Sequence, residues 1–168
     1  ECTILPDDVS TRPGPALFTN PLTALAIAEA AKIEGHKALI HTAAASNLGQ
    51  MLVKICVEDK IPLVNVVRRQ EHVDLLRSIG ATHVCDSSLP SFRDDLLAAC
   101  KETGATIGFD ALGGGRMADH LLWAMETAAI SRMDFYSPYG SYEFTKCYSY
   151  GLLDTSPTEI HHMDYGVM

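Results

Sequence analysis

The chain has 168 residues, enough for one domain with a substantial hydrophobic core. Thirteen basic residues stand against twenty-one acidic ones, and the net charge of −8 disfavours nucleic-acid backbones and anionic membranes as partners. No apolar run approaches the roughly 18 residues of a membrane span, no signal peptide is visible, and the five scattered cysteines indicate free thiols, so we expect a cytoplasmic protein.

The predicted elements alternate between helices and strands. Residues 1–20 are predicted to form an extended N-terminal segment, and a helix begins at Pro21 and ends near Gly35. Apolar and β-branched runs predict strands at 37–42, 62–68, 83–86, 106–110 and 145–150, with helices at 48–58, 70–79, 91–102 and between 113 and 129. This order predicts an α/β fold over residues 21–150: a doubly wound, mostly parallel sheet with helices on both faces, the Rossmann fold. Residues 151–168 form a polar C-terminal tail.

The turn after the first strand carries the strongest site signal. Ala44, Ser46 and Gly49 occupy the three positions of the G-x-G-x-x-G spacing. Small residues are needed there because a pyrophosphate must approach the backbone N–H groups at the helix N-terminus, and a bulky residue at Gly49 would hold the helix off the sheet. The helix itself places Leu48, Met51, Leu52 and Ile55 on one face. Two of the three glycines are replaced, so the prediction of a dinucleotide site needs support from other parts of the sequence.

One further signal is a pair of arginines, Arg68 and Arg69, which follows the second strand about twenty residues beyond the turn. An acidic residue there usually binds a free ribose 2′-hydroxyl, whereas arginine suits a 2′-phosphate because its planar fork donates charge-assisted hydrogen bonds. The pair therefore favours NADP(H) over NAD(H) as cofactor. The alternative is a solvated basic pair in front of a surface helix.

Four segments in order resemble one protein family: NPLTAL, HTAAASNLGQ, VNVVRRQEHVDLLRSIGA and TGATIGFDALGGG. They are similar to the cofactor-binding domain of the medium-chain dehydrogenase/reductase superfamily, in its zinc-independent quinone oxidoreductase and enoyl reductase branch. The resemblance runs from about Leu5 to the end of the chain. It implies NADPH-dependent hydride transfer to a quinone, activated double bond or carbonyl of a small molecule.

The resemblance also implies roles for single residues. The pyrophosphate would be bound by the turn and helix start, at Ala45, Ser46, Asn47 and Leu48, and the 2′-phosphate by Arg68 and Arg69. Asp110 and Tyr139 would lie beside the cofactor, and Asn20 and Thr23 near its nicotinamide end. Zinc-dependent relatives carry a cysteine ligand just before the segment matching NPLTA, where this chain has Phe18, Thr19 and Asn20, so no metal is expected.

In this family the active site also needs a barrel-like catalytic domain, which these residues do not encode. The isolated chain is therefore expected to bind cofactor but to turn over little, with residues 151–168 as the start of the return to the missing domain. The last strand, 145–150, would either pair with its copy in a homodimer or form an ordinary sheet edge.

The sequence also allows other interpretations of single motifs and of the whole chain. Tyr142 and Lys146 match the Y-x-x-x-K pair of short-chain dehydrogenases, but the segment is strand-like and chance explains the match better. His161, His162 and Asp164 are more simply surface residues than metal ligands. As a whole, the chain could instead be a non-catalytic NADPH-sensing module or a degenerate Rossmann scaffold that binds nothing.

Overall fold

A computed structural model describes residues 18–161 of the chain. Its helices are α1 (Thr19–Ile33), α2 (Asn47–Glu58), α3 (Gln70–Ser78), α4 (Phe92–Thr103) and α5 (Met117–Ile130). Its strands are β1 (Leu39–His41), β2 (Leu63–Val67), β3 (His83–Asp86), β4 (Ile107–Asp110) and β5 (Lys146–Ser149). The described part of the chain contains no helix long and apolar enough to cross a membrane.

The five strands form one parallel sheet in the order β3-β2-β1-β4-β5. The order reverses at β1, because the chain runs outward on one side through β2 and β3 and then crosses to β4 and β5. This is the doubly wound Rossmann arrangement that the sequence predicts, and the predicted α/β fold is confirmed. In such a sheet, ligands bind at the carboxyl ends of the strands next to the reversal.

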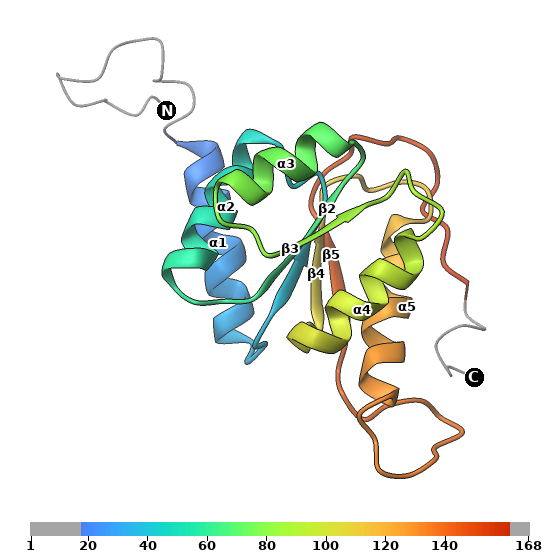
Figure 1. Cartoon of the computed structure of the whole chain (residues 1–168). Coiled ribbons are helices and arrows are strands. Elements are labelled where there is room, and N and C mark those ends of the chain that lie inside the picture. Colours follow the sequence, from blue (N-terminus) through green and yellow to red (C-terminus); the bar gives the residue numbers. More distant parts are fainter. Residues whose placement is uncertain (1–17, 162–168) are drawn as a thin grey trace, which may run out of the picture.

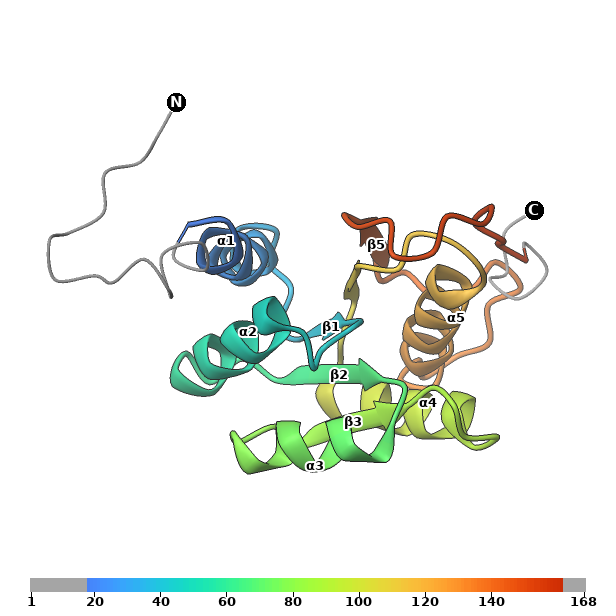
Figure 2. The same ribbon diagram turned by 90° about the horizontal axis from the view of Figure 1, so that it is seen from above.

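Two hydrophobic layers cover the sheet, and successive strand residues alternate between them. Leu39 and Leu63 pack against α1, α2 and α3, while Ile40 and Val64 pack against α4 and α5. Figures 1 and 2 show α1 and α2 on one side of the sheet and α4 and α5 on the other. Because β1, β2 and β4 are buried on both faces, most of their side chains are apolar, and their buried polar residues are His41, Asn65 and Asp110.

The inward face of α2 differs by one position from the predicted one. Its buried residues are Gly49, Leu52, Val53 and Cys56, whereas Leu48, Met51 and Ile55 are only partly buried at the edge of the same core. The turn before the helix accounts for the shift, because it lies directly against Gly49 and so fixes which side of the helix faces inward.

Candidate functional site

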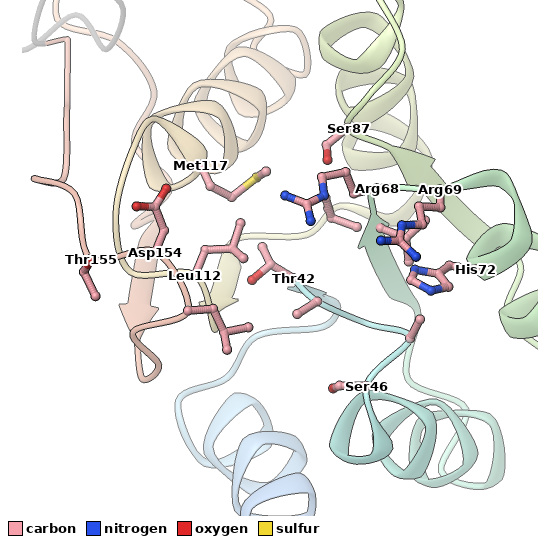
Figure 3. A pocket seen from close by; sticks show the side chains of 15 residues that line it. Thr42, Ser46, Arg68, Arg69, His72, Ser87, Leu112, Met117, Asp154 and Thr155 are labelled. Carbon is pink, nitrogen blue, oxygen red and sulfur yellow. The ribbon is translucent and has the colours of Figure 1, made fainter.

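A pocket of about 700 Å³ lies at the carboxyl ends of the strands, at the reversal in strand order. It is lined by the ends of β1 and β2, the turns after them, the turn after β4 and the segment that follows β5. Figure 3 shows these side chains around one opening, and the lining residues are Thr42, Ala43, Ala45, Ser46, Val66, Val67, Arg68, Arg69, His72, Ser87, Leu112, Met117, Leu153, Asp154 and Thr155.

Gly49 holds the turn and helix α2 in close contact. A Cβ at Gly49 would lie 2.1 Å from the Ala44 carbonyl oxygen, far inside van der Waals contact. The Ser46 hydroxyl caps the helix by accepting a hydrogen bond from the Gly49 N–H at 3.2 Å. The Ala44 N–H donates to the Val66 carbonyl, which fixes the turn to β2. Gly49 therefore has a steric reason to lack a side chain, and Ser46 has a hydrogen-bonding one.

The helix start leaves backbone donors for an anion. The N–H groups of Ala45, Asn47 and Leu48 have no hydrogen-bond acceptor among the described residues. The predicted role of Ser46 needs correction, because its N–H donates to the Ala43 carbonyl at 2.9 Å and its contribution is the cap. The donors stand at the positive end of the α2 dipole, where a phosphate group is favoured.

Asp110 is buried beneath the pocket and does not face the opening, which corrects its predicted place beside the cofactor. Its carboxylate accepts hydrogen bonds from the Thr42 hydroxyl at 2.7 Å and from the backbone N–H groups of Leu112 and Gly113 at 3.0 Å each. The Thr42 hydroxyl in turn accepts from the Ala111 N–H. Asp110 therefore ties the turn after β4 to the end of β1, and both turns line the pocket.

Arg68 and Arg69 stand at the end of β2, as predicted, but they point in different directions. In Figure 3, Arg68 extends across the pocket towards Leu112 and Met117, whereas Arg69 extends beside His72 at the start of α3. Arg69 pairs with Glu71 at 3.1 Å, and no ion pair within residues 18–161 involves Arg68. His72 was not predicted as a site residue, although its place three residues after Arg69 puts both on one face of a helix start.

The segment after β5 forms the wall opposite the arginines and was also not predicted. Leu153, Asp154 and Thr155 line the pocket there (Figure 3). A Cβ at Gly113 would lie 2.3 Å from the carbonyl oxygen of Gly151, so the segment can lie on the turn after β4 only because that turn is built from glycine. Hydrogen bonds from Ser156 lower the pKa of the Asp154 carboxyl, which favours its charged form.

Six predicted residues are absent from the pocket lining: Asn47 and Leu48 at the start of α2, the buried Asp110, and Asn20, Thr23 and Tyr139. Asn20 and Thr23 are in the first turns of α1, at the same end of the sheet as the pocket. Tyr139, in contrast, is 69% exposed in the loop between α5 and β5, which Figure 1 shows at the far end of the molecule. Ser141 fixes this loop by donating two hydrogen bonds to the Glu126 carboxylate. Tyr139 therefore does not line this pocket, and its place near the cofactor or substrate stays a prediction.

The structure also places two other motifs of the sequence, the Y-x-x-x-K pair and the histidines near the C-terminus. Tyr142 lies in a loop and Lys146 begins β5, where it pairs with Glu34 at 2.6 Å, so the two do not share the helix face that the short-chain dehydrogenase pair requires. His162 and Asp164 lie outside the described residues. Within residues 18–161 no cluster of three or more metal-ligating side chains is found.

Comparison with solved structures finds proteins that are similar to this chain over most of its length. It matches a Mesorhizobium loti protein provisionally assigned as an NADPH:quinone reductase, with 32% identity and a TM-score of 0.78, over 94% of this chain and 41% of that one. An enoyl thioester reductase from Candida tropicalis, in a mutant form, matches with 18% identity, a TM-score of 0.67 and 94% and 42% coverage. A mycobacterial protein complexed with NADPH matches with 17% identity, a TM-score of 0.66 and 95% and 44% coverage.

These matches confirm the predicted resemblance to the cofactor-binding domain of medium-chain quinone and enoyl reductases. The chain spans less than half the length of each of the three structures. No family model matches the chain, and no curated protein matches it.

Proposed function

We propose that this chain is the NADP(H)-binding domain of a reductase that transfers hydride between NADPH and a small quinone, enone, enoyl or carbonyl substrate. The observation that carries the proposal is a pocket lined by Ala45 and Ser46 before and at the N-cap of α2 and by two arginines at the end of β2. Beside it, the N–H groups of Ala45, Asn47 and Leu48 have no acceptor among residues 18–161. The resemblance to an NADPH:quinone reductase at 32% identity supports the same reading.

The residues of the pocket fit a dinucleotide phosphate. The N–H groups of Ala45, Asn47 and Leu48 would hold the pyrophosphate, and the close contact at Gly49 keeps these donors in place. Arg68 and Arg69 would bind the 2′-phosphate by charge-assisted hydrogen bonds. The bound cofactor would supply the hydride, while this chain would bind and orient it.

Several parts of the proposal concern the parent protein. The catalytic barrel would come from chain outside this sequence, so the isolated domain would bind cofactor with little turnover. Zinc independence is proposed from the residues at 18–20, which lack a cysteine ligand. A cytoplasmic location stays a prediction, as does the homodimer through β5, whose Tyr148 is 41% exposed at the sheet edge.

Titration calorimetry with NADPH and, separately, NADH tests the proposal on this chain. We expect clear preference for NADPH, and we expect Arg68→Ala to weaken NADPH binding by about 1–3 kcal/mol while leaving NADH almost unchanged. Arg77→Ala, which removes an equally exposed cation from the far end of α3, is the matched control. If Arg68→Ala loses equal affinity for both cofactors, Arg68 does not contact the 2′-phosphate.

Two alternatives remain distinguishable. A non-catalytic NADPH-sensing module would bind NADPH in the same way, but its full-length parent would not oxidise NADPH in the presence of quinones or enones. A degenerate scaffold would bind neither cofactor. Within residues 18–161, amide donors at the start of α2 without an acceptor and an Arg68 without an ion-pair partner favour a binding domain over a degenerate one.

A further inference from the structure

The start of α3 holds a carboxylate oxygen between two groups that line the pocket. The Glu71 Oε1 atom lies 3.1 Å from Arg69 Nη1 and 3.8 Å from His72 Nε2. Arg69 and His72 face the pocket, and Glu71 is absent from its lining. Arg69 donates a hydrogen bond to this carboxylate oxygen, and the His72 ring lies next to it, beyond hydrogen-bond distance. One donor and one ring nitrogen from the pocket wall therefore face an anionic oxygen that belongs to the protein itself.

We propose that Arg69 and His72 form a seat for the 2′-phosphate of the cofactor, and that Glu71 fills this seat as an internal anion when no cofactor is bound. This inference rests on the proposed function. It adds a ligand, His72, and a residue that opposes cofactor binding, Glu71.

The exchange is physically reasonable because a phosphate oxygen accepts the same hydrogen bonds as a carboxylate oxygen and carries more charge. The Arg69 and Glu71 side chains are 61% and 67% exposed, so water screens their ion pair and the pair is weak. A 2′-phosphate can therefore displace Glu71 from Arg69. NADH has a hydroxyl at this position, which does not compete for a cationic seat and can donate a hydrogen bond to the carboxylate.

Glu71 accordingly lowers the preference for NADPH over NADH. Removing its charge should strengthen NADPH binding and leave NADH binding unchanged or slightly weaker. Since exposed ion pairs of this kind contribute little, we expect a two- to five-fold gain, on the order of what a screened pair supplies. Removing the imidazole should act in the opposite direction and on NADPH alone.

The test is calorimetry of the wild type and of Glu71→Gln and His72→Ala, each with NADPH, NADH and adenosine 2′,5′-bisphosphate. Glu58→Gln is the matched control, because it removes one exposed acidic charge from the distant end of α2. We expect Glu71→Gln to tighten NADPH and the bisphosphate about two- to five-fold, and His72→Ala to weaken both by a similar factor. NADH should respond to His72→Ala no more than it does to the control.

The outcomes separate this inference from the proposed function. If the wild type prefers NADPH but Glu71→Gln behaves like Glu58→Gln, the proposed function stands and the internal-anion role of Glu71 is overturned. If His72→Ala weakens NADPH and NADH equally, His72 is not a ligand of the 2′-phosphate. If the wild type binds neither cofactor, both the function and this inference fail.

Discussion

Gly49→Ala isolates the close approach between the turn and α2. The new Cβ would lie 2.1 Å from the Ala44 carbonyl oxygen and 2.6 Å from its carbon, both backbone atoms that cannot rotate away. Helix α2 must therefore move back from the turn, which strains the core and breaks the hydrogen bond from the Gly49 N–H to the Ser46 hydroxyl. Overpacking costs about 1–3 kcal/mol and loss of a cap about 1 kcal/mol, whereas alanine gains about 1 kcal/mol in helix propensity. The net loss of folding free energy is about 1–3 kcal/mol.

Urea unfolding measures the loss of folding free energy, and an NADPH titration of the folded variant measures the effect on the site. Gly104→Ala is the control, because Gly104 has φ +70° with no atom near its missing Cβ and lies at the end of α4 opposite the pocket. It should lose stability through backbone strain but keep its affinity for NADPH. A Gly49→Ala variant as stable as the wild type would refute the steric argument. A destabilised variant with unchanged NADPH affinity would refute the phosphate site at this turn.

Two further predictions concern buried polar groups. Asp110→Asn replaces a carboxylate oxygen by an amide that cannot accept all three hydrogen bonds, so we expect a loss of about 1–3 kcal/mol in urea unfolding and weaker NADPH binding. Burial lowers the pKa of His41 from 6.5 to about 4, so the unfolded chain takes up a proton on His41 that the folded chain does not. The contribution of neutral His41 to the free energy of unfolding is therefore complete above pH 6.5. It falls by about 3 kcal/mol as the pH drops to 4, because each pKa unit corresponds to about 1.4 kcal/mol. His41→Phe should flatten this part of the curve of unfolding free energy against pH; an unchanged slope would contradict the assignment.

The succession of helices and strands along the chain could be predicted because the relevant signals are local, whereas the order of the strands in the sheet, with its reversal at β1, comes from the structure. Strands β1, β2 and β4 lie in mostly apolar runs of the length a buried strand needs, and Gly35 and Gly104 end their helices with φ +80° and +70°, which glycine adopts without strain. The Ala44–Gly49 spacing was likewise sufficient, since the steric contact it implies joins residues only five apart. Most edges of these elements shifted by one or two residues, as frayed helix ends and short strands do, and β3 kept its predicted bounds.

The misplaced residues depended on contacts that join distant parts of the chain. Asp110 is drawn under the pocket by Thr42, 68 residues earlier, and no local pattern near Asp110 records that hydrogen bond. The position of Tyr139 could have been predicted from the direction in which α5 runs along the sheet. Since α5 leaves the carboxyl end of β4 and runs back along the sheet, the loop that follows it must lie at the amino end. The same rule assigns Asp154, just after β5, to the pocket.

The charges of the pocket argue for a short-range mode of anion recognition. The chain carries a net charge of −8, so its overall field repels a dinucleotide phosphate. Arg68 and Arg69 both come from the end of β2, and the carboxylate of Asp154 lies on the opposite wall of the pocket. In physiological salt, charges separated by more than about 8 Å are largely screened, so the attraction must come from groups in contact with the phosphate. Selectivity between NADPH and NADH would then be decided by a few hydrogen bonds at the start of α3, where Glu71 competes for the same donors.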